Sequence, residues 1–280
     1  ADLGGASKFT NIKKSNPENF IQCGISEANM IGVGCGLSSE GFIPYVHTFG
    51  PFATRRVYDQ IYLSGAYAHN TINIYGSDPG FTGPNGGTHT TWEDVALMRE
   101  IPGSVIVDPC DETQTRWVVK ELSKYEGVHY IRANRKNVRN VYTTDSTFEL
   151  GKGNVLREGK DILIIVSGQL VSDALDCAEK LVEEGYSVEV IDMYCIKPLD
   201  IDLVLSESKG KKAVVTFENH SIYGGLGSAV AEVLMENGVN VPFKRHGVDE
   251  RFGQVGTPDF LQKEFHLTAD DLYKTVKSML

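Results

Sequence analysis

The sequence predicts two doubly wound α/β domains with mostly parallel sheets. Short β-branched runs alternate with helical patterns along the 280 residues, and these runs are almost continuously apolar. A strand that is covered on both faces needs apolar side chains in both directions, and helices between strands make parallel connections possible. The strand candidates are, in chain order, residues 71–76, 104–109, 128–133, 161–168, 187–193, 213–219 and 241–247.

The helices between these strands are indicated by their spacing and their ends. In residues 172–185 apolar side chains recur every three or four positions, and Gly185 follows the last of them. Residues 268–280 begin with Thr268 and Asp271 at the spacing of a capping box. Both segments are therefore expected to be amphipathic helices.

A polar segment separates the two predicted domains. Residues 134–160 contain glycines and show no clear period, which is typical of a crossing segment. We place the boundary near residues 143–156, so that the first domain covers 1–150 and the second 151–280. The chain opens on "ADLGG" without an initiator Met, and the first domain lacks an early strand and helix. We therefore expect an N-terminal segment to be missing.

Composition excludes several classes of function. The net charge of −10 argues against general nucleic-acid binding. The five cysteines form no CxxC or CxxH pair, so reduced thiols in a cytoplasmic protein are expected. No apolar run reaches the ~18 residues of a membrane span, and no signal peptide is visible. A P-loop, an HExxH motif and a "GDG…N" motif are also lacking, so no metal site is expected within this sequence.

Glu27 is a carboxylate at the head of an otherwise small and apolar segment, residues 24–42. An ordinary helix start explains such a residue, with Ser26 as the N-cap and Glu27 favoured in the first turn by the helix dipole. A functional carboxyl is the alternative.

A long glycine-rich loop follows the strand that ends at Tyr75. It runs to His89, which is predicted to open a helix. Loops at the carboxyl ends of parallel strands are where α/β proteins place ligands. His89 is therefore either a helix cap or a functional residue.

Two further windows each allow a functional and a structural interpretation. Phe49 and Phe52 stand three apart, a spacing that is also usual for core side chains. Basic residues cluster after the strand at 128–133, which suggests either an anion site or a solvated basic loop. The cluster consists of Arg132, Arg135, Lys136 and Arg139.

Taken together, these windows resemble one family. "ADLGGAS", "GISEANM", "GFIPYVHTFGPF", "SDPGFTGPNGGTH", "VIVDPCDETQ" and "IRANR" occur in the order and spacing of the pyrimidine-binding domain of transketolases. The remainder resembles the C-terminal domain of that family. The resemblance covers essentially the whole chain and corresponds to the second half of a full-length transketolase. The chain therefore looks like the C-terminal subunit of a split transketolase.

The resemblance implies a thiamine-diphosphate-dependent transferase. The expected reaction moves a two-carbon ketol unit from a ketose phosphate to an aldose phosphate. A separate N-terminal subunit would carry the diphosphate-binding "GDG…N" domain and hold Mg²⁺ or Ca²⁺. This chain would be inactive without that partner, and homodimerisation would give an α2β2 assembly.

The resemblance also implies roles on the cofactor side of the site. Glu27 matches the carboxyl that is hydrogen-bonded to N1′ of the aminopyrimidine. Phe49 and Phe52 match the residues that flank this ring. Asp2 and Leu3 match residues beside the thiazolium.

On the substrate side, the match is less complete. His89 matches the histidine that contacts the donor oxygens near C1 and C2, while Arg135 and, approximately, Ser7 match residues that bind the sugar phosphate. Asn85 stands in place of an aspartate that orients the donor hydroxyl, and Ser77 in place of a phosphate-contacting histidine. These two departures leave the sugar open. A further histidine, at position 220, is expected to be structural.

Three alternatives remain at this point. Deoxyxylulose-phosphate synthases and the β subunits of 2-oxoacid dehydrogenase decarboxylases share the architecture, and "YDQ" at 58–60 is more like theirs. The eleven positions from Asp78 to His89 favour transketolases. The third alternative is a non-enzymatic small-molecule binder of doubly wound fold.

Overall fold

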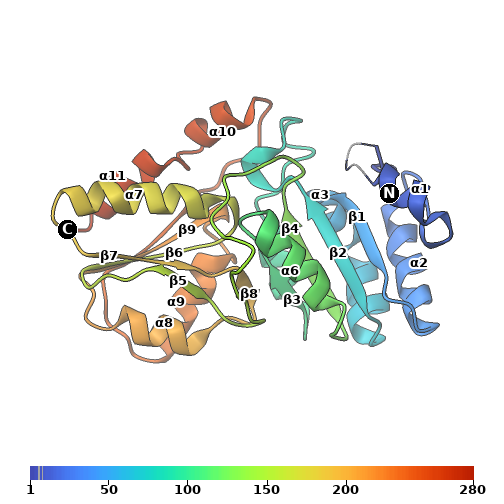
Figure 1. Cartoon of the computed structure of the whole chain (residues 1–280), viewed down its shortest axis with the longest axis horizontal. Coiled ribbons are helices and arrows are strands. Elements are labelled where there is room, and N and C mark those ends of the chain that lie inside the picture. The colour runs from blue at the N-terminus through green and yellow to red at the C-terminus, as the bar shows by residue number, and fades with distance from the viewer. Residues whose placement is uncertain (6, 8) are drawn as a thin grey trace.

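The computed structural model describes residues 1–5, 7 and 9–280 of the chain. Its two sheets follow one another along the long axis, and helices flank both (Figure 1). The first sheet has the order β1-β2-β4-β3-β8, with bounds Tyr45–Phe49 (β1), Ile72–Ser77 (β2), Val128–Ala133 (β4), Val105–Val107 (β3) and Cys195–Lys197 (β8). The second has the order β10-β9-β6-β7-β5, with bounds Phe243–Val248 (β10), Ala213–Ser221 (β9), Ile162–Val166 (β6), Val188–Asp192 (β7) and Asn154–Arg157 (β5).

Each sheet combines parallel strands with one antiparallel edge. In the first sheet β8 pairs antiparallel with β3, and in the second β5 pairs antiparallel with β7. The remaining neighbours are parallel. The predicted fold class, two doubly wound α/β sheets that are mostly parallel, is confirmed. Strand β8 lies in the second half of the sequence but completes the sheet of the first half.

The helices follow the strands in the alternation that the sequence predicts. They are α1 (Thr10–Ser15), α2 (Glu27–Ser39), α3 (Gly50–Ala53), α4 (Tyr58–Gln60), α5 (Asp94–Arg99), α6 (Glu112–Leu122), α7 (Val171–Glu183), α8 (Ile201–Ser208), α9 (Leu226–Glu236), α10 (Pro258–Glu264) and α11 (Ala269–Lys277). Short 3₁₀ turns lie at η1 (Pro17–Asn19), η2 (Arg55–Val57), η4 (Gly80–Thr82) and η5 (Gly168–Leu170), and η3 (Ile61–Tyr67) is a π-helix. The capping box that begins α11 is present, with Thr268 and Asp271 bonded as predicted.

The cores show why most strand residues are apolar. In β6, Ile162 and Ile164 belong to the cluster that contains α7 and α11, whereas Leu163 and Ile165 belong to the cluster that contains α8 and α9. Figure 1 shows these helix pairs on opposite faces of the second sheet. Alternate side chains of one strand therefore enter two different cores, as a doubly wound sheet requires.

All seven predicted strands are present, and three further strands were not predicted. β1 carries His47 and Thr48, which interrupt its apolar run although both are buried. β5 and β8 are short edge strands that are defined by distant antiparallel partners. Local sequence patterns contain no signal for such pairings.

The prediction that His89 opens a helix is wrong, because α5 begins at Asp94. His89 lies in a single turn in which the amides of His89 and Thr90 both donate to the Gly86 carbonyl at 3.0 Å. The carbonyl of Thr91 then accepts from the amide of Gly80 at 3.0 Å. The Thr91 carbonyl is therefore bonded to Gly80 and does not take part in a helix that begins at His89. We call residues 78–93, between β2 and α5, the glycine loop.

No helix in the described part of the chain is both long and apolar enough to cross a membrane. All five cysteines carry free thiols.

Candidate active site

The candidate site lies at the carboxyl edge of the first sheet. Strands β1, β2 and β4 are neighbours, and they end at Phe49, Ser77 and Ala133. Because neighbouring parallel strands end at the same edge, the segments that follow them converge there. These segments carry the aromatic pair, the glycine loop and Arg135.

Three rings form an aromatic cluster at this edge. The ring centres of Phe49 and Phe52 are 6.2 Å apart, and the His89 ring lies 5.8 Å from Phe49 and 5.0 Å from Phe52. All three side chains are only partly buried. Thr88 Oγ1 lies 2.8 Å from Nδ1 of His89. The two phenylalanines therefore form part of an accessible surface rather than the interior of the core.

Glu27 joins the cluster through an arginine. Its side chain is 6% exposed at the first position of α2, and its Oε2 lies 3.0 Å from Nη1 of Arg56. The carbon of the same guanidinium lies 3.6 Å from the centre of the Phe52 ring. Ser26 occupies the N-cap position, but its hydroxyl donates to the Cys23 carbonyl at 2.6 Å instead of capping the helix. The Ser26 cap is therefore absent, whereas Glu27 does stand in the first turn, as the dipole explanation expects.

Arg135 is fixed beside Phe49. Its Nε donates to Oδ2 of Asp78 at 2.6 Å, and its backbone amide donates to Oδ1 of Asp78 at 3.1 Å. The guanidinium carbon lies 4.7 Å from the centre of the Phe49 ring. The arginine is thus held between an aromatic face and a carboxylate at the start of the glycine loop.

Ser7 contacts a histidine that sequence reasoning missed. Nε2 of His47 lies 3.2 Å from Ser7 Oγ, and the His47 ring stacks on Tyr75, with 4.5 Å between ring centres. Burial, with the positive charge of Arg135, lowers the pKa of His47 to about 3, so the imidazole is neutral. His47 precedes Phe49 by two positions in β1. This period of two places both side chains on one face, and it is the signal that could have identified His47.

The remaining predicted residues lie around this group. Asn85 is exposed and forms a β-bridge with Val255, and Asp2 is exposed and accepts a hydrogen bond from Gln22 at 2.9 Å. Leu3 is half-buried. Ser77 is fully buried, with its hydroxyl 3.5 Å from the Thr48 carbonyl oxygen, and is not open to a ligand.

The basic cluster separates in the structure, because Arg132 lies within β4, so its members do not form one anion site together. Arg132 is buried and lies 2.7 Å from Asp94 and 3.3 Å from Asp108. Arg139 pairs with Asp176 at 2.8 Å. Arg135 lies at the candidate site, whereas Arg132 is part of an internal charge network.

Two family models match this chain. The transketolase pyrimidine-binding domain matches residues 1–141, and the transketolase C-terminal domain matches residues 151–272. The chain belongs to the transketolase family.

The transketolase relatives include separate subunits. The 6-deoxy-6-sulfo-D-fructose transketolase subunit of a Clostridium species is 44% identical, over 98% of this chain and 85% of that subunit. One of the subunits of the apulose-4-phosphate transketolase of Phocaeicola vulgatus is 37% identical, over 98% of this chain and 88% of its own length. A solved structure described as a split-gene transketolase, inactive β4 tetramer, superimposes with a TM-score of 0.93 at 40% identity, covering 100% of this chain and 90% of that one.

Proposed function

We propose that this chain is the C-terminal subunit of a two-part transketolase. A separate subunit with a "GDG…N" domain completes the site, and the pair moves a two-carbon ketol unit between phosphorylated or otherwise anionic sugars. The observation that carries the proposal is the convergence of Glu27, Phe52, His89 and Arg135 at one sheet edge. The names of the relatives, which are subunits, support the two-part arrangement.

The residues at this edge fit the aminopyrimidine end of thiamine diphosphate. The Arg56 guanidinium, a planar hydrogen-bond donor, already lies against the Phe52 face and beside the Glu27 carboxylate. This ring and this carboxylate can therefore contact a flat group at the same time, and an aminopyrimidine bound there would take over contacts that Arg56 now makes. When bound, thiamine diphosphate supplies a carbon nucleophile at its thiazolium.

Glu27 is the proposed proton-holding group. Its carboxyl lies at the head of α2, largely removed from water, and would hold a hydrogen bond to N1′ of the aminopyrimidine. Phe49 and Phe52 provide flat apolar walls for the ring, and a stacking contact contributes about 1 kcal/mol. Asp2 and Leu3 are proposed to lie beside the thiazolium.

His89 is proposed to contact the donor sugar near C1 and C2. Thr88 fixes the ring at Nδ1, so we assign the substrate contact to Nε2, as a hydrogen-bond partner or proton shuttle. Asn85, on the same loop, is proposed to orient a donor hydroxyl through an uncharged hydrogen bond.

The anionic end of the sugar is proposed to bind at Arg135, Ser7 and His47. Arg135 supplies the charge, and the Asp78 contact orients it. We assign His47 to the place that the family resemblance gave to Ser77. Ser77 is fully buried, whereas the His47 imidazole contacts Ser7, which is only partly buried. The class of ligand is a ketose with one anionic group, either phosphate or sulfonate, since one relative is named for a sulfo-sugar and another for a sugar phosphate.

The divalent cation, Mg²⁺ or Ca²⁺, is proposed to be held by the partner subunit. The described residues of this chain contain no group of three or more His, Cys, Asp or Glu side chains that could hold one. The expected assembly is α2β2 in the cytoplasm.

The test is ketol transfer by the mixed subunits. The purified chain is combined with its "GDG…N" partner, thiamine diphosphate and Mg²⁺, and assayed with a phosphorylated and a sulfonated ketose in separate arms. We expect transfer in the mixture and none with either subunit alone. Turnover of pyruvate-like acids instead of ketoses would indicate a decarboxylase or a deoxyxylulose-phosphate synthase. Ligand binding without any turnover, unchanged in a Glu27→Ala variant, would indicate a non-enzymatic binder.

A further inference from the structure

The glycine loop is hydrogen-bonded to a side chain of the second sheet. Asn219 is a buried residue of β9, and its amide contacts the loop on both sides of Gly80. Its Oδ1 accepts a hydrogen bond from the Phe81 amide at 3.2 Å, and its Nδ2 donates to the Pro79 carbonyl at 3.1 Å. One amide thus bonds two buried backbone groups of a loop in the other half of the chain, and the Pro79 carbonyl also accepts from Thr82 Oγ1 at 2.6 Å.

The two Asn219 hydrogen bonds require a glycine at the position between them. Gly80 has a φ of +61°, and a Cβ at this position would collide with the Asn219 amide. Gly80 therefore serves both the left-handed backbone conformation and the close approach of Asn219. The pair forms an interlocked contact with no space for a larger residue.

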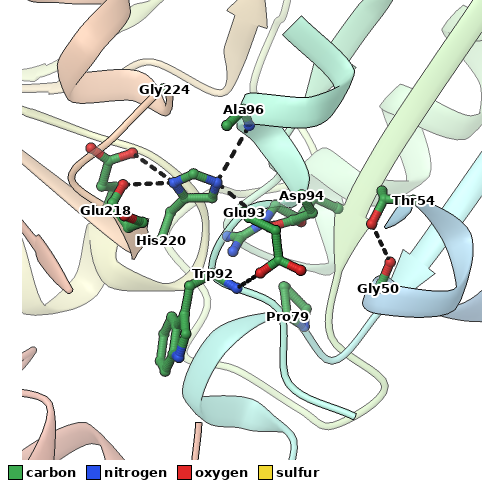
Figure 2. A network of polar contacts seen from close by, with 12 residues as sticks. Gly50, Thr54, Pro79, Trp92, Glu93, Asp94, Ala96, Glu218, His220 and Gly224 are labelled. Atoms are coloured by element: carbon green, nitrogen blue, oxygen red, sulfur yellow. Dashed lines mark hydrogen bonds and ion pairs between the residues drawn. The ribbon is translucent and has the colours of Figure 1, made fainter. Parts of the chain in front are cut away.

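Asn219 is itself fixed by a buried charge network. Its carbonyl accepts a hydrogen bond from Nη2 of Arg132 at 2.5 Å, and Arg132 pairs with Asp94 at 2.7 Å. Figure 2 shows the next residue, His220, between Glu218 and the first turn of α5. His220 Nε2 accepts from the Ala96 amide at 3.4 Å, and burial lowers the pKa of His220 to about 4, which keeps this nitrogen an acceptor. The backbone from which the Asn219 side chain extends is therefore held by Arg132 and by the contact of His220 with α5.

The contact with Pro79 lies one residue from the anion-binding group. Asp78 precedes Pro79 and holds the Arg135 guanidinium through its Oδ2. The Asp78 amide donates to the Ala133 carbonyl at 3.2 Å, which ties this end of the loop to β4. Asp78 is thus held by β4 on one side, and the Asn219 contact with Pro79 constrains the chain on its other side.

We propose that Asn219, in the C-terminal domain, is a positioning residue that sets the glycine loop and, through Asp78, the Arg135 guanidinium for the anionic end of the substrate. This assignment rests on the proposed function for its kinetic consequence. It gives the C-terminal domain a part in substrate affinity in addition to assembly. The residue acts through Asp78 and Arg135 and has no assigned contact with the substrate.

The test uses two Asn219 variants and a control. Asn219→Asp keeps the shape and the acceptor toward Phe81 but replaces the donor toward Pro79 with an oxygen. Asn219→Ser removes the hydrogen bonds to Phe81 and Pro79, because the serine side chain is too short to reach them. Asn240→Asp, at an exposed position of the same domain, makes the same charge change and serves as the control.

The first measurement is hydrogen exchange in the purified chain, which needs no activity. We expect amides of residues 78–91 to exchange about tenfold faster in both Asn219 variants, since a buried hydrogen bond is lost, while strands β6 and β7 keep their protection. Unchanged exchange in the loop, or a uniform increase over the second sheet, would overturn the assignment. The control should match the natural protein.

The second measurement is the kinetics of the mixed subunits. We expect Asn219→Asp to raise the KM for the anionic ketose about tenfold and to change kcat by less than about threefold, because ground-state positioning is affected more than chemistry. A lower kcat with unchanged KM would contradict the proposal. If the natural mixture shows no ketol transfer, the proposed function fails, and the exchange experiment still decides whether Asn219 positions the loop.

Discussion

The guanidinium of Arg56 lies against the carboxylate of Glu27, with 3.0 Å between Nη1 and Oε2. The same group covers the face of Phe52. A planar cation thus occupies the surface that we assign to a planar ring of the cofactor. Arg56 keeps the Glu27 carboxylate paired in this chain, and it must share or leave this position when the aminopyrimidine binds.

Replacing Glu27 with Gln should abolish most ketol transfer. The amide has the same shape but cannot hold the proton, and loss of a group that holds or transfers a proton typically costs 10²–10⁴-fold in rate. The assay is ketol transfer by the mixed subunits, with circular dichroism to confirm that the variant is folded. Near-full activity of Glu27→Gln would contradict the assigned role.

Replacing Arg56 with Ala should destabilise the chain more than replacing its neighbour Arg55. Arg56→Ala leaves a carboxylate that is 6% exposed without its partner, which costs about 1–2 kcal/mol after allowance for the half-exposed arginine. Arg55 pairs with Glu93, and these side chains are 42% and 36% exposed, so its loss should cost less than about 1 kcal/mol. Urea unfolding of both variants gives the comparison, and equal midpoints would count against a special Glu27–Arg56 contact.

Replacing His47 with Asn should weaken binding of anionic ketoses selectively. The shorter side chain no longer reaches Ser7, so we expect the KM of a phosphorylated or sulfonated ketose to rise about tenfold. The KM of a ketose without an anionic group should stay unchanged and is the internal control. Because the pKa of His47 is about 3, the ratio of variant to natural KM should be constant between pH 5.5 and 8. A ratio that varies with pH would mean that His47 binds as a cation.

Replacing Asp192 with Asn should flatten the pH dependence of stability. Asp192 is fully buried at the end of β7 and accepts hydrogen bonds from Gln114 at 2.8 Å and Tyr142 at 2.7 Å. Burial raises its pKa to about 7. A raised folded pKa contributes stability at low pH that is lost as the pH rises through that value.

Between pH 5 and 7.5 the natural chain should therefore lose up to about 3 kcal/mol relative to Asp192→Asn, since each pKa unit corresponds to about 1.4 kcal/mol. The pKa of Glu218 is also raised to about 7, and that of His220 is lowered, but both groups are present in the two proteins. The difference between the proteins isolates Asp192. Parallel stability curves would show that this carboxyl is charged throughout.

Much of the fold could be predicted because the strands that are buried on both faces are mostly apolar. β1 could not, because His47 and Thr48 are buried polar residues, and the contact of His47 with Ser7 comes from forty positions away. The edge strands β5 and β8 are defined by their partners rather than by their own composition.

For Glu27 and His89, residue type and position left a structural and a functional interpretation open, and only the resemblance to a family suggested their roles at the site. Arg56 was not identified, because its role follows from two tertiary contacts at once. Arg132 was grouped with the basic cluster, for which an anion site and a solvated loop both stayed open, and it fits neither interpretation. Arg132 is part of strand β4. Its side chain is directed into the interior, where it forms ion pairs with Asp94 and Asp108.

Strand β8 limits where a gene for this protein can be divided. Lys197 ends β8, and its Nζ donates to the carbonyls of Arg99 at 2.7 Å and Ile101 at 2.6 Å, so β8 is attached to the first sheet by side chain as well as backbone. A chain interrupted at residue 150 would leave the edge of β3 open to pairing with another molecule. The smallest self-sufficient unit of the first sheet must therefore extend past Lys197. A fragment that ends at the linker would therefore lack an edge strand of its own first sheet.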